Sequence, residues 1–394
     1  MRVAFFIEIF YPEINGVLTA TLNLAENMKR RGHQVLLVAP YSREFHEPRI
    51  LNDIEVFYTP SFSTFVYPGV RFTWPWSRPL REKLLRDKIE IFHVTGPWTH
   101  AAAALLLGRK AGIPVVQTFH TMINEDSYLQ YGVRLKFLMP LARSIIWRYM
   151  GAFLKPSTIV TAPSLYAKEE IEARFPELQV RHVPNGIDTA VFDQAAGPEE
   201  LRRKWPLFNE RSFVYVGRLG YEKSVDVLLR AFARVAAEDA RARLFVVGDG
   251  PARDHLHGLK SSLGLDASVQ FTGKIAHREL LTSGLLHHAR AFVTASLTEN
   301  QPMTVIEAAC AGLPIVIADV RGIRELLMDN GLLFEPGDVA GLAGCLRRML
   351  DDDQAVGRFK ANSGRARRLF DGGEVAGRFE VLYDEARGRS AKAD

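Results

Sequence analysis

Two glutamates eight positions apart lie in the stretch TENQPMTVIEAACAGLP, residues 298–314, where a loop leads into a helix. Thr304–Ala311 is predicted to be that helix, with a glycine just past its end. Glu299 then lies in the loop and Glu307 in the helix's first turns. Both carboxylates can face one cleft beside the N–H groups of a helix N-terminus, which attract anions. A lone Glu307 would be explained by its effect on the helix dipole, so a functional interpretation depends on the pair.

A pair of cations follows a predicted strand earlier in the same half of the chain. In FVYVGRLGYEKS the strand ends at Gly217, and Arg218 and Lys223 come before a helix that is predicted to open at Ser224. Two cations at the carboxyl end of a strand can clamp a diphosphate. A solvated basic turn explains this segment equally well when it is taken alone.

A glycine turn, VVGDGP, follows the next strand and would let the backbone approach a ligand at Gly248 and Gly250. It lacks the full spacing of a dinucleotide-binding motif, so by itself it is a weak signal. Together, the basic turn, the glycine turn and the glutamate pair are three candidate sites at strand ends. Their combination favours a single ligand site.

The first half of the chain carries two further candidates. Gly16 lies in the segment PEINGV after the first predicted strand, just before a helix that is predicted to open near Thr19. That loop could face phosphates from the opposite side. His120 follows the strand VVQTF. Most lone histidines are packed or capping residues, but its position at a strand end makes His120 a candidate functional residue.

Metal ligation is not expected anywhere in the chain. The D-x-D spacing occurs in DDDQ, within Asp351–Asp353, where a solvated turn is the better interpretation. No cluster of His, Cys, Asp and Glu has the spacing of a metal site. We therefore predict that the protein uses neither a metal ion nor another cofactor.

Size and composition predict a soluble two-domain protein. The 394 residues exceed one ordinary core, and the apolar fraction of 47% with a charged fraction of 24% is typical of globular proteins. Cys310 and Cys345 are too few for a disulfide framework and indicate a reducing compartment. The N-terminus resembles no signal peptide, and no apolar run is long enough to span a membrane. A cytoplasmic location is expected.

Positive charge is concentrated in the first half of the chain. Residues 1–180 hold 21 Lys+Arg against 16 Asp+Glu, a net charge of +5, whereas residues 181–394 hold 29 of each. No acidic residue occurs between Asp126 and Glu169. This asymmetry predicts an anionic partner for the N-terminal domain.

Short β-branched runs alternate with helical patterns throughout, which predicts parallel sheets with crossover helices. We expect two doubly wound α/β domains, residues 1–184 and 185–370, joined near VPNGIDTAVF, with a C-terminal helix in 371–394 that packs back toward the first domain. Ligands of such folds bind beyond the carboxyl ends of the strands. The predicted strands are RVAFFIE, QVLLVAP, IEVFYTP, IEIFHV, PVVQTF, TIVTAP and QVRHVP, then SFVYVG, RLFVVGD, SVQFTG, AFVTAS, PIVIA and GLLFEP.

The order of these motifs resembles the retaining glycosyltransferases of family 4. The resemblance covers nearly the whole chain and rests on the glycine loop after the first strand, FHT, PNGID, GR-x4-K, VGDGP, E-x7-E and AGLP. It implies the GT-B fold, in which two Rossmann-like domains face each other across a cleft. It also implies metal-independent transfer of a hexose from a nucleotide-diphosphate sugar, such as UDP-glucose, with retention of configuration.

The resemblance also implies roles for individual residues. Arg218 and Lys223 would bind the diphosphate and stabilise the leaving group, while Glu307 would accept hydrogen bonds from the ribose hydroxyls. Glu299 would meet the hydroxyls of the transferred sugar, near which His120 would also lie. The remaining donor-binding residues would be Gly16, Gly217, Gly248, Gly250, Asn300 and the amides of Met303 and Thr304. The family's glycine-rich EGFG is replaced here by ENQP, which should tune the choice of sugar.

The acceptor is expected to be a membrane lipid such as diacylglycerol. In VRLKFLMPLARSIIWRYMGAFLKP, a helical wheel puts Arg143, Arg148 and Lys155, with Trp147 and Leu154 among them, on an outward basic-aromatic half, which suits an anionic membrane surface. The other half, an apolar face that is expected to be buried, holds Leu135, Leu138, Ala142, Ile145, Ile146 and Tyr149. A core helix with a solvated basic side is the alternative. The pattern HTM…ED…Y…Y resembles family members that glycosylate diacylglycerol or related lipids, and FVYPGVRFTWPW is a candidate membrane-facing loop.

We therefore expect a peripheral enzyme on the inner face of the cell membrane, with no nucleic-acid partner. Three rival functions stay open. A soluble transferase would act on a sugar phosphate or a polysaccharide. A nucleotide-sugar isomerase on the same fold would need no acceptor. A non-catalytic sensor would bind the donor but release no nucleoside diphosphate.

Overall fold

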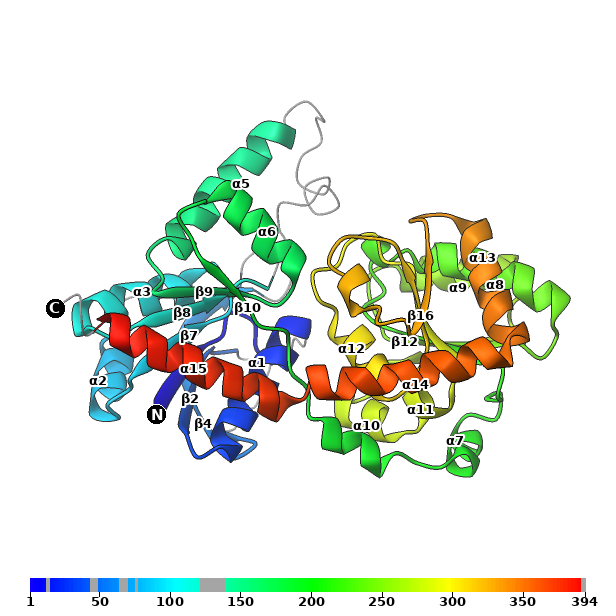
Figure 1. Ribbon diagram of the computed structural model, residues 1–394, viewed down its shortest axis with the longest axis horizontal. Helices are drawn as coiled ribbons and strands as arrows, with labels where there is room; N and C mark the ends of the chain where they lie inside the picture. Colours follow the sequence, from blue (N-terminus) through cyan, green and yellow to red (C-terminus); the bar gives the residue numbers. More distant parts are fainter. Residues whose placement is uncertain (12–14, 43–48, 64–69, 75–76, 121–138, 391–394) are drawn as a thin grey trace. The chain divides into compact units, whose positions relative to one another are not determined.

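The computed structural model describes residues 1–11, 15–42, 49–63, 70–74, 77–120 and 139–390. These residues form two compact units (Figure 1). The first combines Met1–Ile187 with Asp371–Asp394, and the second is Asp188–Phe370. The chain therefore passes from the first unit to the second after Ile187, three residues beyond the predicted boundary. The end of the chain returns to the first unit.

The first unit is built on an eight-stranded sheet in the order β10-β9-β8-β7-β1-β2-β4-β3. All neighbouring strands run parallel except β3 and β4, and a separate antiparallel pair is formed by β5 and β6. The strands are β1 (Arg2–Phe6), β2 (Gln34–Pro40), β3 (Ile50–Leu51), β4 (Ile54–Thr59), β5 (Ser61–Ser63), β6 (Arg71–Thr73), β7 (Ile91–Val94), β8 (Val115–Thr118), β9 (Ile159–Ala162) and β10 (Val180–His182).

Helices cover both faces of this sheet because alternate strand residues point to opposite sides. Val3 and Phe5 of β1 pack against α1 and α15, whereas Ala4 and Phe6 pack in the opposite layer with α2 and α3. A third cluster joins α5 and α6 to β9. The helices are α1 (Gly16–Arg30), α2 (Arg78–Arg86), α3 (Thr99–Ala111), α5 (Met139–Leu154), α6 (Leu165–Arg174) and α15 (Gly372–Ser390).

The C-terminal helix α15 is attached to the first unit by both polar and apolar contacts. Arg31 Nη2 donates to Glu380 Oε2 at 2.6 Å, and the His33 ring lies 2.6 Å from the other carboxylate oxygen. These partners, Arg31 foremost, lower the pKa of Glu380 to about 2. The Tyr383 hydroxyl meets His93 Nδ1 at 2.6 Å inside the core. Residues 371–390 are thus part of the first unit's core.

The second unit contains a six-stranded parallel sheet in the order β13-β12-β11-β14-β15-β16. The strands are β11 (Ser212–Val216), β12 (Arg243–Val247), β13 (Val269–Gly273), β14 (Ala291–Thr294), β15 (Ile315–Ala318) and β16 (Gly331–Phe334). The helices are α7 (Pro198–Lys204), α8 (Val225–Glu238), α9 (Arg253–Ser262), α10 (His277–Thr282), α11 (Leu285–His288), α12 (Met303–Cys310), α13 (Val339–Asp351) and α14 (Asp353–Leu369), with 3-10 turns η2 (Thr189–Gln194), η3 (Tyr221–Lys223) and η4 (Arg324–Leu326).

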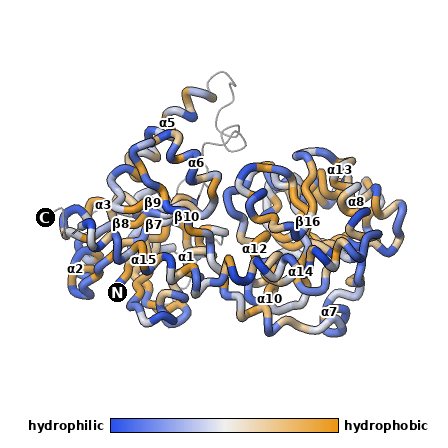
Figure 2. Tube along the Cα trace, viewed as in Figure 1, coloured by the Kyte–Doolittle hydropathy of each residue, from blue (hydrophilic) through white to orange (hydrophobic). Residues whose placement is uncertain are grey.

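The predicted architecture of two doubly wound α/β units is confirmed. Each of the thirteen predicted strand segments contains a strand, and Figure 2 shows hydrophobic residues concentrated along these strands. The short strands β3, β5 and β6 were not predicted. The first helix begins at Gly16 rather than near Thr19, because the Asn15 side chain caps it by accepting from Leu18 N at 2.8 Å. Among the described helices, none has the length and apolar character that crossing a membrane requires.

Candidate functional site

The candidate donor site lies at the centre of the second unit's sheet. From β11 the chain proceeds outward through β12 to β13, and then returns to the other side of β11 with β14. The loops after β11 and β14 therefore diverge at one topological switch point, where α/β sheets bind ligands. The first loop carries Arg218 and Lys223, and the second carries Glu299 and leads into α12.

The two loops meet through an ion pair. Lys223 Nζ donates to Glu299 Oε1 at 2.5 Å, and the side chains are only 19% and 14% exposed. The loops are also joined by backbone, since Leu297 N donates to Glu222 O at 3.0 Å. The structure therefore brings together Lys223 and Glu299, two of the predicted site residues. A cation and a hydroxyl acceptor in contact suit a ligand that carries both phosphate and sugar.

Arg218 is held by a partner that the sequence prediction missed. Its Nη2 donates to Glu222 Oε1 at 2.6 Å, and the glutamate side chain is 6% exposed against 47% for the arginine. The Tyr215 hydroxyl donates to Arg218 O at 3.0 Å, and burial, with a smaller effect of Glu299 and Glu222, raises its pKa well above 10. The i,i+4 spacing of Arg218 and Glu222 was the available signal.

Two glycines let the strand ends pack against each other. A Cβ on Gly248, whose φ is +136°, would lie 1.9 Å from the Gly217 carbonyl oxygen, and one on Gly250 would lie 2.7 Å from the Leu219 carbonyl oxygen. Gly217 N and Leu219 N donate to Val247 O and Asp249 O, both at 3.0 Å. The glycines are thus required for close packing of the loops after β11 and β12, one of which carries Arg218. Whether these glycines also touch a ligand stays a prediction.

Helix α12 supplies the second glutamate and a set of N–H groups. Glu307 is 2% exposed, and its Oε1 lies 2.7 Å from His277 Nε2, a partner that was also missed. The first described backbone partner within the helix belongs to Val305, whose N–H donates to Pro302 O at 3.2 Å. The N–H groups of Met303 and Thr304 precede it at the positive end of the helix dipole.

The backbone of the ENQP segment, which begins at Glu299, packs closely against Gly322. A Cβ on Gly322, whose φ is +83°, would lie 2.6 Å from the carbonyl oxygens of both Glu299 and Asn300. Gln301 is buried, and Pro302 stands at the N-cap of α12 with φ −70°, where its missing N–H costs little. The loop therefore keeps its helix entry without the glycines of EGFG.

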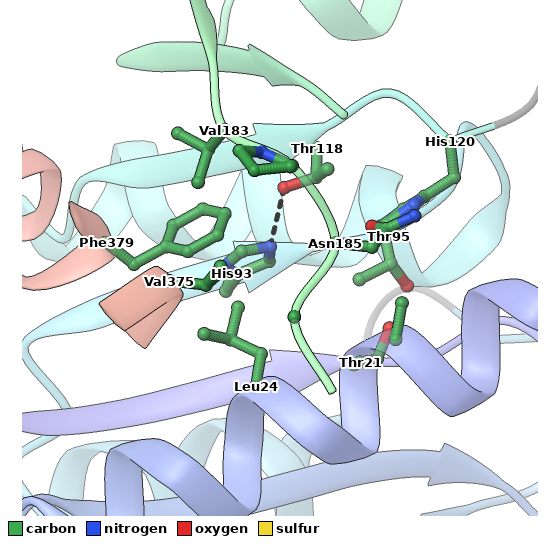
Figure 3. Close-up of a pocket in the computed structure, with 13 residues that line it drawn as sticks. Thr21, Leu24, His93, Thr95, Thr118, His120, Val183, Asn185, Val375 and Phe379 are labelled. Atoms are coloured by element: carbon green, nitrogen blue, oxygen red, sulfur yellow. Dashed lines mark hydrogen bonds between the residues drawn. The ribbon is translucent and has the colours of Figure 1, made fainter. Parts of the chain in front are cut away.

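His120 lines a small pocket in the first unit (Figure 3). The figure shows His120, Thr95, Asn185 and Thr21 toward one end and Leu24, Val375 and Phe379 toward the other. Burial lowers the pKa of His120 to about 4, so its ring is neutral at physiological pH. Gly16 is exposed at the first residue of α1.

A chain of buried hydrogen bonds lies beside this pocket. His93 Nδ1 meets the Tyr383 hydroxyl at 2.6 Å and its Nε2 meets Thr118 Oγ1 at 2.9 Å, which in turn contacts Thr161 Oγ1 at 2.7 Å. Burial, aided by the proximity of His120, lowers the pKa of His93 to about 3. This neutral network joins β7, β8 and β9 to α15.

Glu8 is a second buried carboxylate that the sequence prediction missed. The chain diverges from β1 toward β2 on one side and later toward β7 on the other, so Glu8 lies at the switch point of the first unit. Its carboxylate accepts from the backbone N–H groups of Trp98, His100 and Ala101 at 2.9–3.3 Å, at the start of α3. Burial outweighs these bonds and raises the pKa of Glu8 to about 7.

The predicted division of α5 into an outward and a buried half is wrong: Trp147 and Leu154 are buried, whereas Ile145 and Tyr149 are exposed. Trp147 is 5% exposed, stacked on Phe119 with ring centroids 6.4 Å apart and edge-on to Phe175 at 5.9 Å. Gly151 lets the helix approach, since a Cβ there would lie 2.9 Å from the Phe175 ring. The buried stripe is Trp147, Met150, Gly151 and Leu154, and the exposed residues of the helix include Leu141, Arg143, Ile145, Arg148 and Tyr149.

Lys155 is exposed but engaged, with Nζ 2.8 Å from Glu177 Oε1 and 5.0 Å from the centre of the Phe175 ring. The pattern HTM…ED…Y…Y falls, after His120, outside the described residues, and so does much of FVYPGVRFTWPW. Within the described ranges, no three His, Cys, Asp or Glu residues are grouped as a metal site would require. Asp352 instead caps α14 by accepting from Ala355 N at 2.8 Å.

Two family models match the chain. The model of glycosyltransferase family 4 matches residues 14–191, and that of group 1 glycosyl transferases matches residues 210–352. Each match falls largely within one of the two units, and the second includes Arg218, Lys223, Glu299 and Glu307.

Relatives and solved structures agree with these models. The chain is 30% identical to the GDP-mannose-dependent alpha-mannosyltransferase of Mycolicibacterium smegmatis over 85% of this chain and 84% of that protein. It is 26% identical to the alpha-monoglucosyldiacylglycerol synthase of Streptococcus pneumoniae over 86% and 77%.

Among solved structures, sucrose-phosphate synthase from Thermosynechococcus elongatus has a TM-score of 0.78 at 19% identity, with 98% of each chain covered. HepE from Anabaena, solved with UDP and glucose, has a TM-score of 0.74 at 18% identity, covering 98% of this chain and 100% of HepE. At this identity the likeness concerns the fold. Taken with the family models and the relatives, it shows that the chain belongs to the family 4 glycosyltransferases and has their GT-B fold.

Proposed function

We propose that this glycosyltransferase moves a hexose (glucose, galactose or mannose) from a nucleotide-diphosphate sugar to a membrane lipid such as diacylglycerol, with retention of configuration and without a metal ion. The proposal of a nucleotide-sugar donor is supported by two hydrogen-bonded ion pairs at the switch point of the second unit, Lys223 with Glu299 and Arg218 with Glu222. HepE was solved with UDP-glucose, which supports a nucleotide sugar as donor.

The chemistry follows from these groups. As the bond between the sugar and the diphosphate breaks, positive charge develops on the sugar and negative charge on the leaving diphosphate. Arg218, Lys223 and the N–H groups at the start of α12 would stabilise that negative charge. The acceptor hydroxyl would bond to the same face of the sugar, and its proton would pass to the departing phosphate. Glu299 and Glu307 would bind sugar and ribose hydroxyls.

The proposal of a lipid acceptor depends on a surface of the first unit, which we call the α5 surface. It consists of Leu141, Ile145 and Tyr149, spaced four residues apart and 59%, 58% and 39% exposed; Arg148, three residues after Ile145, flanks them, and Arg143 is exposed on the same helix. Exposed apolar residues with flanking cations suit an anionic lipid surface. The name of the Streptococcus pneumoniae relative, a glucosyldiacylglycerol synthase, supports the same acceptor class.

Aromatic contacts extend the α5 surface to a neighbouring hairpin. The ring centroids of Tyr149 and Trp98 lie 6.1 Å apart. The Trp98 and Phe72 centroids lie 5.9 Å apart, and those of Phe72 and Phe62 lie 6.1 Å apart. Phe62 is 57% exposed. The apolar path therefore runs from α5 to the β5–β6 pair, and β6 belongs to the segment FVYPGVRFTWPW, in which the sequence predicts a membrane-facing loop.

The test is a product assay with separate donors and acceptors. UDP-glucose, UDP-galactose and GDP-mannose are each offered with diacylglycerol in anionic vesicles, with a sugar phosphate, or with no acceptor. We expect one of the donors to give glycolipid and nucleoside diphosphate, and to do so only when the lipid is the acceptor. Transfer only to the soluble acceptor would favour the soluble transferase, and an altered nucleotide sugar without acceptor would favour the isomerase. Binding without release of nucleoside diphosphate would indicate a sensor.

The same assay tests the proposed absence of a metal requirement. Activity should survive excess chelator, because the charges of Arg218 and Lys223 would do the work of a divalent cation. Loss of activity that Mg²⁺ or Mn²⁺ restores would contradict this part of the proposal. The linkage of the product, determined by nuclear magnetic resonance, tests whether the configuration is retained.

A further inference from the structure

Glu307 is held by a histidine from another element. Its side chain is 3% exposed, and Oε1 lies 2.7 Å from Nε2 of His277, the first residue of α10. Thirty residues separate the two in sequence. A buried carboxylate is costly unless it is hydrogen-bonded, and the imidazole supplies that bond.

The contact makes the two carboxylate oxygens of Glu307 inequivalent, because only Oε1 is bonded to the histidine. A carboxylate can only accept, so the histidine carries a proton on Nε2 and donates it to Oε1. Within the described part of the chain, no hydrogen bond is recorded for Oε2 of Glu307. Oε2 is therefore the oxygen left to accept from a ligand hydroxyl. The histidine side chain itself is 41% exposed, so the pair lies at the edge of the site.

We propose that His277 is a positioning residue for the donor nucleotide: it fixes the carboxylate of Glu307 so that Oε2 can accept from the ribose. This inference rests on the proposed function, in which Glu307 binds the ribose. The ribose does not react, so its contacts contribute equally to the ground state and the transition state. His277 should then affect nucleotide affinity and the KM for the donor, and leave kcat nearly unchanged.

The experiment is a double-mutant cycle in the full-length protein, with UDP and GDP as calorimetric probes. The variants are His277→Ala, Glu307→Ala and both together, with His277→Gln as the conservative replacement, because its amide can donate to the same oxygen. His255→Ala, an exposed histidine on α9, is the matched control. Thermal unfolding of every variant reports folding.

We expect His277→Ala to weaken binding of whichever nucleotide the parent protein binds by about tenfold, as coupling through one charge-assisted hydrogen bond implies. The donor KM should rise by a similar factor. His277→Gln should bind within about threefold of the parent, on the same reasoning. The double variant should bind no more weakly than Glu307→Ala alone, and the control should match the parent.

Each other outcome overturns the inference in a distinguishable way. If Glu307→Ala weakens binding but His277→Ala does not, or if the two losses multiply in the double variant, His277 does not act through Glu307. If His277→Gln binds as poorly as His277→Ala, the hydrogen bond is not the cause. If the parent binds neither nucleotide, or Glu307→Ala binds as the parent does, the proposed function fails at Glu307 and the inference fails with it.

Discussion

At the scale of single residues, the charges of the donor site come in pairs. Lys223 contacts Glu299, Arg218 contacts Glu222, and Glu307 contacts His277. Pairing places each side chain in one position before a ligand arrives, and this lowers the ordering cost of binding. It also separates two classes of residue: those that would touch the donor, and those that hold them.

The two cations should be most important in the transition state. Replacing Lys223 or Arg218 by Ala removes a charge that opposes the negative charge on the leaving diphosphate, so kcat should fall by about a hundredfold or more. Arg230→Ala, an exposed arginine on α8, is the control for loss of one positive charge. Steady-state kinetics with the preferred donor measures the effect. Near-normal kcat in both variants would show that the switch point is not the reaction site.

Glu8 should make folding depend on pH. Its folded pKa is about 7 and its ordinary value 4.5, so between these values the folded protein holds a proton that the unfolded chain has lost. The free energy of unfolding should therefore decrease as pH rises through this window, by roughly 3 kcal/mol in all. Glu8→Gln cannot titrate and should lack that decrease.

Urea unfolding of the parent and the Gln variant from pH 4.5 to 8 measures the difference, in which titration of all other groups cancels. Glu82→Gln, the same change at an exposed position of α2, is the control and should follow the parent. Parallel curves for the parent and Glu8→Gln would show that Glu8 keeps its ordinary pKa after folding.

At the scale of elements, glycines decide how closely the strand-end loops of the second unit approach each other. Gly248→Ala places a methyl group 1.9 Å from the Gly217 carbonyl oxygen and forces L geometry at φ +136°. We expect a loss of at least about 2 kcal/mol in the free energy of unfolding, because neither backbone segment can move without breaking sheet hydrogen bonds.

Gly258→Ala is the matched control for this prediction. Gly258 lies inside α9, where an added Cβ would meet no atom within 4 Å, so alanine should stabilise the helix by about 0.5–1 kcal/mol. Chemical denaturation of the two variants should thus give changes of opposite sign. A destabilisation by Gly258→Ala as large as that by Gly248→Ala would refute the steric explanation.

The positions of most helices and strands could be predicted from the sequence. Alternating apolar runs and helix signals correctly indicate thirteen parallel strands and the helix after Pro302. The strands β3, β5 and β6 have two or three residues that are mostly exposed or half-buried, so they carry no sustained apolar pattern. Trp147 was misassigned because a helical wheel cannot show that Phe119 and Phe175 enclose one side of α5.

Partners from distant segments could not be predicted by the same means. His277 lies thirty residues from Glu307, and Trp98 lies ninety residues from Glu8. Such pairs depend on the side-chain directions that the folded sheet imposes, which local periodicity does not contain. The ligand-contacting candidates were found by their types at strand ends, whereas the residues that hold them required the structure.

At the scale of the whole molecule, the uneven charge of the chain and the α5 surface bear on the same question. The excess of positive charge lies in residues 1–180, and Arg143 and Arg148 are exposed on the same helix as the exposed Leu141 and Ile145. Cations attract an anionic membrane over a distance, and apolar side chains contribute only after they enter it. The two contributions should therefore respond differently to salt.

We predict that the protein binds anionic vesicles in two separable parts. Arg143→Glu with Arg148→Glu should remove the salt-sensitive part, because each cation near the surface contributes about 1 kcal/mol and each acid opposes binding. Ile145→Asp should remove the salt-resistant part, since burying one isoleucine side chain contributes about 1.5–3 kcal/mol. Lys155 is already paired with Glu177, so its replacement should matter less.

Vesicle flotation at low and high ionic strength measures both parts. Arg230→Glu with Arg234→Glu, the same charge change on exposed positions of α8, is the control and should float nearly as the parent does. If the arginine pair of α5 and that of α8 weaken flotation equally, net charge rather than the α5 surface governs binding. If the parent protein never floats, the acceptor is not reached at a membrane, and the soluble-acceptor alternative gains the support that the lipid proposal loses.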